Sequence, residues 1–143
     1  MESIAITSHF SLSGPLDYAD LAVLKARGID VIVNCRLENE EPNQISSQEY
    51  KKAIEAQNMR YASIPVRSLV YPKDDIARFK ALVNAPQNNV HAFCRTGKRV
   101  SHLWALSQIP EKSIDRIMNE CKEANVDISV IAEQLHDLAK LSK

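Results

Sequence analysis

The residues best suited to chemistry are Cys94 and the short basic segment that follows it, Arg95-Thr96-Gly97-Lys98-Arg99. An apolar run typical of a strand, Val90–Phe93, ends at this cysteine, and an apolar-periodic helix is expected from Val100 onward. In such a turn, backbone N–H groups point inward and the next helix presents its positive end to the same place. These dipoles and three basic side chains favour the thiolate form of Cys94 and attract an anionic substrate. The segment therefore predicts a cysteine nucleophile inside an anion-binding loop.

Two residues of this loop are predicted to be catalytic, and the others to bind the substrate. Cys94 is the nucleophile, and Arg99 presents a planar guanidinium fork that suits the oxygens of an oxyanion. Gly97 is expected because the loop needs either a positive φ or a close backbone approach at this position. The predicted substrate-binding residues of the loop are Arg95, Thr96, Gly97 and Lys98.

Other reactive or charged side chains have structural as well as functional interpretations. Arg36 follows a predicted strand, so it is expected either to bind the substrate beside the loop or to pair with a carboxylate of the acidic run Glu38–Glu41. That run is itself predicted to be a solvated loop. Cys35 is expected to be a buried strand-end thiol, with a resolving thiol as the alternative, and Cys121 is expected in the core. His102 is expected to face the solvent.

Composition and charge exclude several classes of protein. Apolar residues make up 45% and charged residues 25% of the chain, which excludes disorder, and its 143 residues fit one domain spanning the whole sequence. The 18 basic and 18 acidic side chains cancel, so the overall charge indicates neither nucleic acid nor an anionic membrane as a partner. The sequence contains neither an apolar run of membrane-spanning length nor a signal-peptide pattern.

The cysteines indicate a reducing environment. Cys35, Cys94 and Cys121 are odd in number and lack Cys-x-x-Cys spacing, which argues against a disulfide framework or a zinc site. We therefore expect a cytoplasmic protein with reduced thiols, no metal ion and no cofactor.

Strand and helix patterns alternate along most of the chain. This alternation favours an α/β layered sheet, mostly parallel, with the Cys94 loop at the carboxyl end of a strand. Strands are predicted at residues 4–7, 10–13, 29–33, 59–64 and 90–93. Helices are predicted before Gly28, after the capping box Ser46-Ser47-Gln48-Glu49, from Asp74 or Asp75, and three times after Arg99.

The segment Cys94–Arg99 resembles the Cys-Arg-Ser/Thr-Gly-x-Arg loop of a small bacterial family with a protein-tyrosine-phosphatase-like fold. Members of this family are described as phosphatase-like or as sulfurtransferases, and the domain also occurs fused to β-lactamase-fold hydrolases. The resemblance covers about residues 3 to 107 and implies a three-layer α/β fold, with a mostly parallel central sheet and helices on both faces. The other segments that carry it are Ser13-Gly14, Val31–Arg36 with Glu40-Glu41-Pro42, Arg60-Tyr61, Ile64–Val66 and Leu103-Trp104.

Three departures from the phosphatase pattern bear on the reaction. Tyrosine phosphatases place Arg six positions after Cys, whereas Arg99 lies five positions after Cys94, as in the shorter loop of rhodanese-type sulfurtransferases. Phe93 stands where phosphatases carry a His. The segment 65–72, where the phosphatase acid loop would fall, contains no Asp, and Asp74 and Asp75 are better explained as the N-cap and first turn of a helix.

The missing acid favours sulfur transfer over phosphate ester hydrolysis. Cleavage of a phosphate monoester expels an alkoxide or phenoxide, and a positioned acid is typically worth ~10²–10⁴ in rate. Transfer from thiosulfate or a persulfide expels sulfite or a thiolate, which leave without a proton. The leading hypothesis is a rhodanese-like sulfurtransferase in which Cys94 forms a persulfide and passes the sulfur to an acceptor thiol or cyanide.

Two alternatives remain open. In a phosphatase of the tyrosine-phosphatase type, Cys94 attacks the phosphate ester and Arg99 binds its equatorial oxygens. In a non-catalytic module, the same loop senses an anion or a persulfide. All three hypotheses imply a small anionic partner, namely thiosulfate, a persulfide or a phosphate ester.

Overall fold

The computed structural model describes residues 1–141 and contains one five-stranded sheet. The strand order is β1-β2-β5-β3-β4, with β1 antiparallel to β2 and the other neighbours parallel. The strands are β1 (Ile4–Thr7), β2 (Phe10–Ser13), β3 (Val31–Asn34), β4 (Arg60–Ser63) and β5 (Val90–Phe93). The helices are α1 (Tyr18–Ala26), α2 (Ser47–Ala56), α3 (Lys73–Val83), α4 (Lys98–Ser107), α5 (Ile114–Glu123), the short 3-10 helix η1 (Ser129–Ile131) and α6 (Ala132–Leu141).

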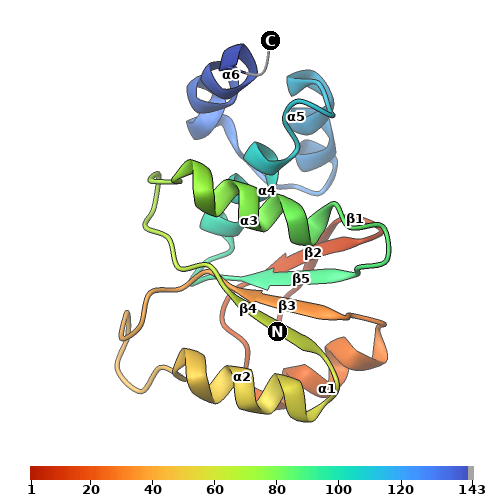
Figure 1. Ribbon diagram of the computed structural model, residues 1–143, viewed down its shortest axis with the longest axis vertical. Helices are drawn as coiled ribbons and strands as arrows, with labels where there is room; N and C mark the ends of the chain where they lie inside the picture. The colour runs from red at the N-terminus through yellow and green to blue at the C-terminus, as the bar shows by residue number, and fades with distance from the viewer. Residues whose placement is uncertain (142–143) are drawn as a thin grey trace.

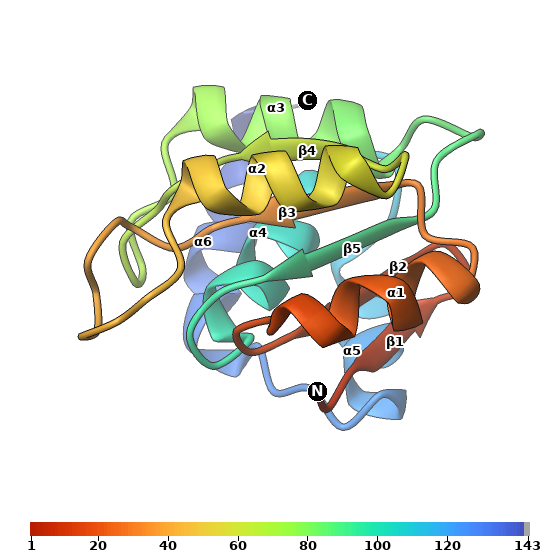
Figure 2. The ribbon, with the colours of Figure 1, turned by 90° about the horizontal axis from the view of Figure 1, so that it is seen from below.

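Helices cover both faces of the sheet (Figure 1). α1 and α2 lie on one face, in front of the sheet in Figure 2, and α3, α4, α5 and α6 lie on the other side. The predicted three-layer α/β arrangement with a mostly parallel central sheet is therefore confirmed. Among the helices of residues 1–141, none is both long and apolar enough to cross a membrane.

β5 is the central strand of the sheet and is buried on both faces. All four of its residues are buried, and so are the four residues of its neighbour β3. The two strands run parallel and in register, from Val31 opposite Val90 to Asn34 opposite Phe93. Their carboxyl ends therefore lie side by side at one edge of the sheet, where Cys94 begins the basic loop.

α4 is enclosed by its surroundings rather than half exposed. It packs between the sheet and the helices α3 and α6, and every residue from Arg99 to Ser107 is buried. The ring of Trp104 stacks on Phe10 of β2, with centroids 5.9 Å apart. The expectation that His102 faces the solvent is therefore wrong, since the ring is buried and its Nδ1 lies 2.7 Å from the hydroxyl oxygen of Tyr71.

The ends of the helices follow local sequence patterns. Ser46 and Glu49 form the predicted capping box of α2, each side chain bonded to the other residue's N–H at 3.1 Å. Gly28 follows α1 at φ +88°, as its predicted stop position requires. α3 begins slightly earlier than predicted, because Pro72 is its N-cap. Asp74 and Asp75 both lie in its first turn, where the positive end of the helix stabilises carboxylates.

Candidate active site

Gly97 shapes the loop between β5 and α4. It is the N-cap of α4 with φ 88°, in the left-handed region that glycine adopts without strain. A Cβ at this position would lie 3.2 Å from Leu12 Cδ1, so a larger residue would also crowd β2. The Gly97 N–H donates to Cys94 Sγ at 3.1 Å. The thiol therefore lies at the N-terminus of α4 and accepts a backbone hydrogen bond, an environment that suits a thiolate.

The end of β2 supports the other side of the loop. A Cβ on Gly14 would lie 3.2 Å from the carbonyl oxygen of Arg95, a tight contact that favours glycine at this position. The Cys94 N–H donates to the carbonyl oxygen of Ser13 at 3.4 Å. Ser13 Oγ lies 2.8 Å from His91 Nε2, and burial lowers the pKa of His91 to about 4. A neutral His91 therefore supports β2 through Ser13, and it does so without adding charge to the loop.

Arg99, in the first turn of α4, is held by two partners. Its Nη1 donates to Glu40 Oε2 at 2.5 Å and to the carbonyl oxygen of Val66 at 2.9 Å, and its Nη2 donates to Glu40 Oε1 at 2.8 Å. The edge formed by Nη1 and Nη2 donates to Glu40, and the second N–H of Nη1 donates to Val66. The opposite edge, formed by Nε–H and the second N–H of Nη2, has no partner within residues 1–141. Because Arg99 lines a pocket, this second edge is available for two oxygens of an anion.

Glu40 is one of the pocket residues that were not predicted from the sequence. The prediction that the acidic run is a solvated loop is wrong for this residue, whose carboxylate binds Arg99, the Leu37 N–H and Arg36. The hydrogen bonds from Arg99 above all lower the pKa of Glu40 to about 2. Glu40 is therefore ionised at neutral pH and has no proton to donate. Its spacing from Arg36 made it one of several possible partners, but nothing in the sequence indicated its bond to Arg99.

Arg36 lies behind Glu40 rather than in the pocket. Its Nε is 3.1 Å from Glu40 Oε1, and its Nη2 is 3.4 Å from Glu41 Oε1. The second contact is an ion pair without hydrogen-bond alignment, so Nη2 is buried without a hydrogen-bond partner in the described part of the chain. Of the two roles expected for Arg36, the structure shows the ion pair with the acidic run, and Arg36 does not line the pocket. Arg36 thus acts on the pocket through Glu40, which in turn fixes Arg99.

The pocket above the loop is strongly basic. It encloses about 430 Å³, and Cys94 lies beneath it with no exposed surface. Its cations come from two segments, since Arg67 on the loop after β4 joins those of the Cys94 loop. Arg67 and Ser68 were not predicted as site residues, although they lie in segment 65–72, where the resemblance places the phosphatase acid loop. The lining residues are Leu37, Glu40, Arg67, Ser68, Arg95, Thr96, Lys98 and Arg99.

The pocket has no acidic proton donor. Its one carboxylate is Glu40, which Arg99 keeps ionised. Asp74 and Asp75 do not line it. Asp75 is half-buried, lies 3.7 Å from Arg78, and is close enough to the buried Cys35 thiol for its charge to help raise the pKa of that thiol. Across residues 1–141, no group of three or more His, Cys, Asp or Glu side chains is placed to hold a metal ion. The chemistry that this site can perform therefore depends on a thiol, backbone N–H groups and cations.

The other two thiols are protonated at neutral pH. Burial raises the pKa of Cys121 to about 12 and raises that of Cys35 strongly as well. Cys121 lies on the buried side of α5, as predicted. Cys35 follows β3 and lies beside Cys94 in the same apolar cluster.

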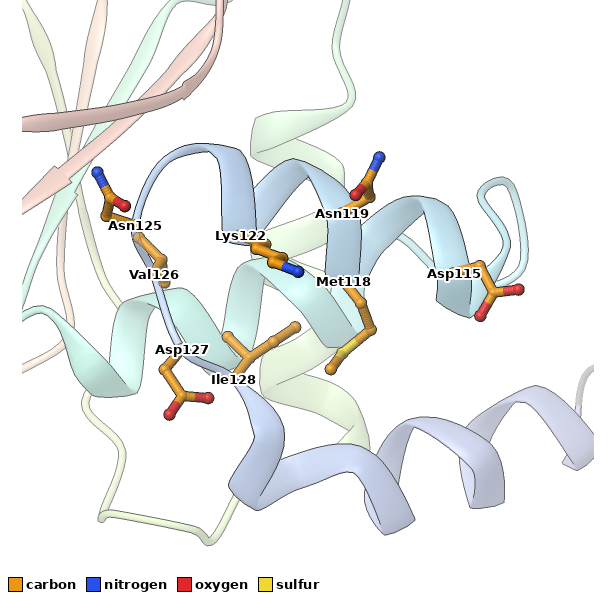
Figure 3. A pocket seen from close by; sticks show the side chains of 8 residues that line it. All are labelled: Asp115, Met118, Asn119, Lys122, Asn125, Val126, Asp127 and Ile128. Atoms are coloured by element: carbon orange, nitrogen blue, oxygen red, sulfur yellow. The ribbon is translucent and has the colours of Figure 1, made fainter.

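A second pocket, of about 460 Å³, lies away from the loop (Figure 3). It forms between α5 and the segment 124–128, where Met118 and Ile128 point toward each other. It is larger than the basic pocket, but it holds no thiol and receives no residue from the Cys94 loop. We therefore place the candidate active site at the basic pocket. The residues that line the second pocket, between α5 and the segment 124–128, are Asp115, Met118, Asn119, Lys122, Asn125, Val126, Asp127 and Ile128.

Comparison with known proteins identifies the family. Residues 3–110 match the family described as "Beta-lactamase hydrolase-like protein, phosphatase-like domain". The chain belongs to this family. A beta-lactamase hydrolase-like protein from Agrobacterium fabrum is 30% identical over 116 residues, which cover 81% of this chain and 27% of the relative. The chain thus spans only about a quarter of that longer protein.

Solved structures show the same fold. A protein from Neisseria meningitidis, described as a candidate phosphatase, is 27% identical with a TM-score of 0.81, over 94% of this chain and 96% of that one. Tk-PTP in its active form is 15% identical with a TM-score of 0.75, over 96% of each chain. The domain therefore has the protein-tyrosine-phosphatase-like fold of a phosphatase-like enzyme family.

Proposed function

We propose that this chain is a cysteine-dependent sulfurtransferase. The Cys94 thiolate attacks the sulfane sulfur of an anionic donor such as thiosulfate, the S–S bond breaks, and sulfite leaves with the bonding electron pair. An acceptor thiol then takes the sulfur from the Cys94 persulfide. The observation that carries this proposal is a basic pocket that is lined by Arg99 and by the loop after Cys94, and whose lining contains no acidic proton donor.

The geometry of the loop supports the first step. The sulfonate oxygens of thiosulfate fit the Nε and Nη2 edge of Arg99, which Glu40 leaves open. The exposed side chains of Arg95, Lys98 and Arg67 add positive charge around the same pocket. A persulfide on Cys94 is an anion, and the Gly97 N–H and the N-terminus of α4 stabilise it as they stabilise a thiolate.

Phosphate ester hydrolysis is the second candidate, and the comparisons favour it. The family is described as phosphatase-like, and the Neisseria meningitidis protein as a candidate phosphatase. In this reaction Cys94 attacks phosphorus, Arg99 binds the equatorial oxygens, and water later hydrolyses the phosphocysteine. Because the pocket supplies no proton, the substrate needs a leaving group that departs as a stable anion.

Steady-state kinetics of both reactions, measured on the same preparation, distinguish the two proposals. Thiocyanate formation from thiosulfate and cyanide is measured beside nitrophenol release from p-nitrophenyl phosphate, using wild type and Cys94→Ser. We expect a higher kcat/KM for thiosulfate and loss of both activities in Cys94→Ser. A higher kcat/KM for the phosphate ester, without thiocyanate formation, would overturn the proposal and establish the second candidate.

A further inference from the structure

A pocket of about 330 Å³ adjoins the basic pocket, and we call it the side pocket. Ser68 and Lys98 line both pockets, so the two share a wall. The rest of the side pocket comes from the turn after β4, from His102 of α4 and from the segment around η1. Its volume falls in the ~300–1,000 Å³ range of sites that bind small molecules. The side pocket is therefore large enough for an organic group whose reactive end lies in the basic pocket.

Leu69, which lines the side pocket, is both exposed and strained. It is the third residue of a turn that the Val70 N–H closes by donating to the Arg67 carbonyl oxygen at 3.1 Å. Its φ of 66° lies in the left-handed region, which costs a leucine free energy and which glycine adopts freely. Gln134 Nε2 of α6 donates to its carbonyl oxygen at 3.3 Å and helps to hold this conformation. Because the side chain is 46% exposed, burial within the chain offsets little of the cost, whereas an apolar ligand would bury more of it.

The charges around the side pocket balance, in contrast to those of the basic pocket. Asp127 lies close enough to Lys98 and His102 for electrostatic interaction. A hydrogen bond from the Ser129 N–H, at 2.9 Å, holds the pKa of Asp127 below its usual range, so this carboxylate is ionised at neutral pH. Burial and then the charge of Lys98 lower the pKa of His102, so its ring is neutral at the same pH. One cation and one anion thus remain beside exposed apolar side chains, which favours an uncharged apolar group over a second anion.

We propose that the side pocket binds the acceptor thiol of the sulfur transfer through an apolar group on that thiol, an assignment that rests on the proposed function. The acceptor has to reach the Cys94 persulfide, and the cations of the basic pocket suit the anionic donor instead. The acceptor thiolate attacks the outer sulfur of the persulfide, a new S–S bond forms, and the bond to Cys94 Sγ breaks. The Cys94 thiolate leaves with the bonding electron pair, the proton of the acceptor thiol passes to the solvent, and the acceptor becomes a persulfide.

The two half-reactions therefore use different pockets. Thiosulfate needs only the basic pocket to transfer its sulfur to Cys94. Cyanide removes the sulfur without the side pocket, because it carries no organic group to bind there. A thiol with an apolar group gains from burial against Leu69 and Val130. Leu69 is thus expected to set the choice among acceptor thiols and to leave persulfide formation unchanged.

Single-turnover kinetics of the full chain test this assignment. The Cys94 persulfide is formed with thiosulfate, excess donor is removed, and loss of the sulfur is followed by intact mass after addition of benzyl mercaptan, 2-mercaptoethanol or cyanide. We expect wild type to react about tenfold faster with benzyl mercaptan than with 2-mercaptoethanol at equal, subsaturating concentrations. Leu69→Asn is expected to lower this preference about fivefold, because asparagine tolerates a positive φ but offers no apolar surface. Its rates of persulfide formation and of reaction with cyanide are expected to equal those of wild type.

Val70→Asn is the matched control, because Val70 is 58% exposed on the same turn and does not line the side pocket. It is expected to keep the wild-type preference. A wild type without preference for benzyl mercaptan, an unchanged preference in Leu69→Asn, or an equal loss in both variants would overturn the assignment of the side pocket while the proposed function stands. A wild type that forms no persulfide with thiosulfate would instead overturn the proposed function, and this assignment with it.

Discussion

The guanidinium of Arg99 has two hydrogen-bonding edges, and Glu40 occupies one of them. This carboxylate fixes the orientation of the side chain, while the bond to the Val66 carbonyl oxygen ties it to the loop after β4. The Nε–H and the second N–H of Nη2 are not used by these bonds, and we propose that they bind a substrate. A lysine would retain the charge but would lose both the fork toward Glu40 and the fork toward the substrate.

We therefore expect Arg99→Lys to lower kcat/KM for thiosulfate by roughly ten- to a hundredfold, or ~1.4–3 kcal/mol. Lys98→Ala is the matched comparison, since Lys98 lines the same pocket with an exposed side chain, and its effect is expected to be smaller. Steady-state kinetics of both variants test this. A neutral Arg99→Lys together with an inactive Lys98→Ala would show that the oxyanion is bound elsewhere in the pocket.

At the scale of elements, the loop after β3 is anchored to α4 by a partly buried ion pair. Glu40 supplies it, and its lowered pKa shows that the folded protein prefers the carboxylate. The unfolded chain binds a proton at this residue below about pH 4.5, whereas the folded chain does so only near pH 2. The stabilisation from this pair is therefore complete above about pH 4.5 and is lost as the pH falls toward 2.

Glu40→Gln removes this pH dependence along with the charge. We expect the variant to be less stable than wild type at pH 7 by about 1–2 kcal/mol, because solvent screens the partly exposed Glu40–Arg99 pair. The difference is expected to shrink by pH 3. Urea unfolding at both pH values measures it, with Glu38→Gln as the control because Glu38 makes no bond to Arg99. An equal loss at both pH values would mean that the charge of Glu40 does not stabilise the fold.

Most elements could be predicted from sequence because each depends on local chemistry. The apolar runs of β3 and β5, the capping box at Ser46 and the glycine at position 97 all act within a few residues. The contacts that were missed join distant segments. His102 is buried because other helices cover α4, and Glu40 reaches Arg99 across 59 positions of the chain. The periodicity and spacing of residues along the sequence do not indicate contacts between segments that are far apart in the chain.

At the scale of the whole molecule, the basic pocket is assembled from the loops after β3, β4 and β5, and the first turn of α4. The carboxyl ends of three parallel strands converge there: the loops after β4 and β5 supply the cations, and the loop after β3 supplies Glu40. None of these segments places a protonated acid over Cys94. The fold thus resembles that of phosphatases, while the pocket limits which leaving groups it can expel.

We expect any phosphatase activity to depend steeply on the leaving group. Nitrophenyl phosphate is expected to be hydrolysed slowly, and alkyl phosphates such as phosphoserine peptides more slowly still, because an alkoxide needs a proton. Asp74→Asn and Asp75→Asn are expected to leave these rates unchanged, since neither residue lines the pocket. Rapid hydrolysis of phosphoserine peptides that is lost in either variant would identify an acid on α3.

The most direct test of the account is the intact mass of the full chain after incubation with thiosulfate. Wild type and Cys121→Ser are expected to gain one sulfur atom, which cyanide then removes, whereas Cys94→Ser is expected to gain none. A wild-type protein whose mass is unchanged by thiosulfate, or a sulfur atom that persists in Cys94→Ser, would contradict the claim that Cys94 carries the transferred sulfur.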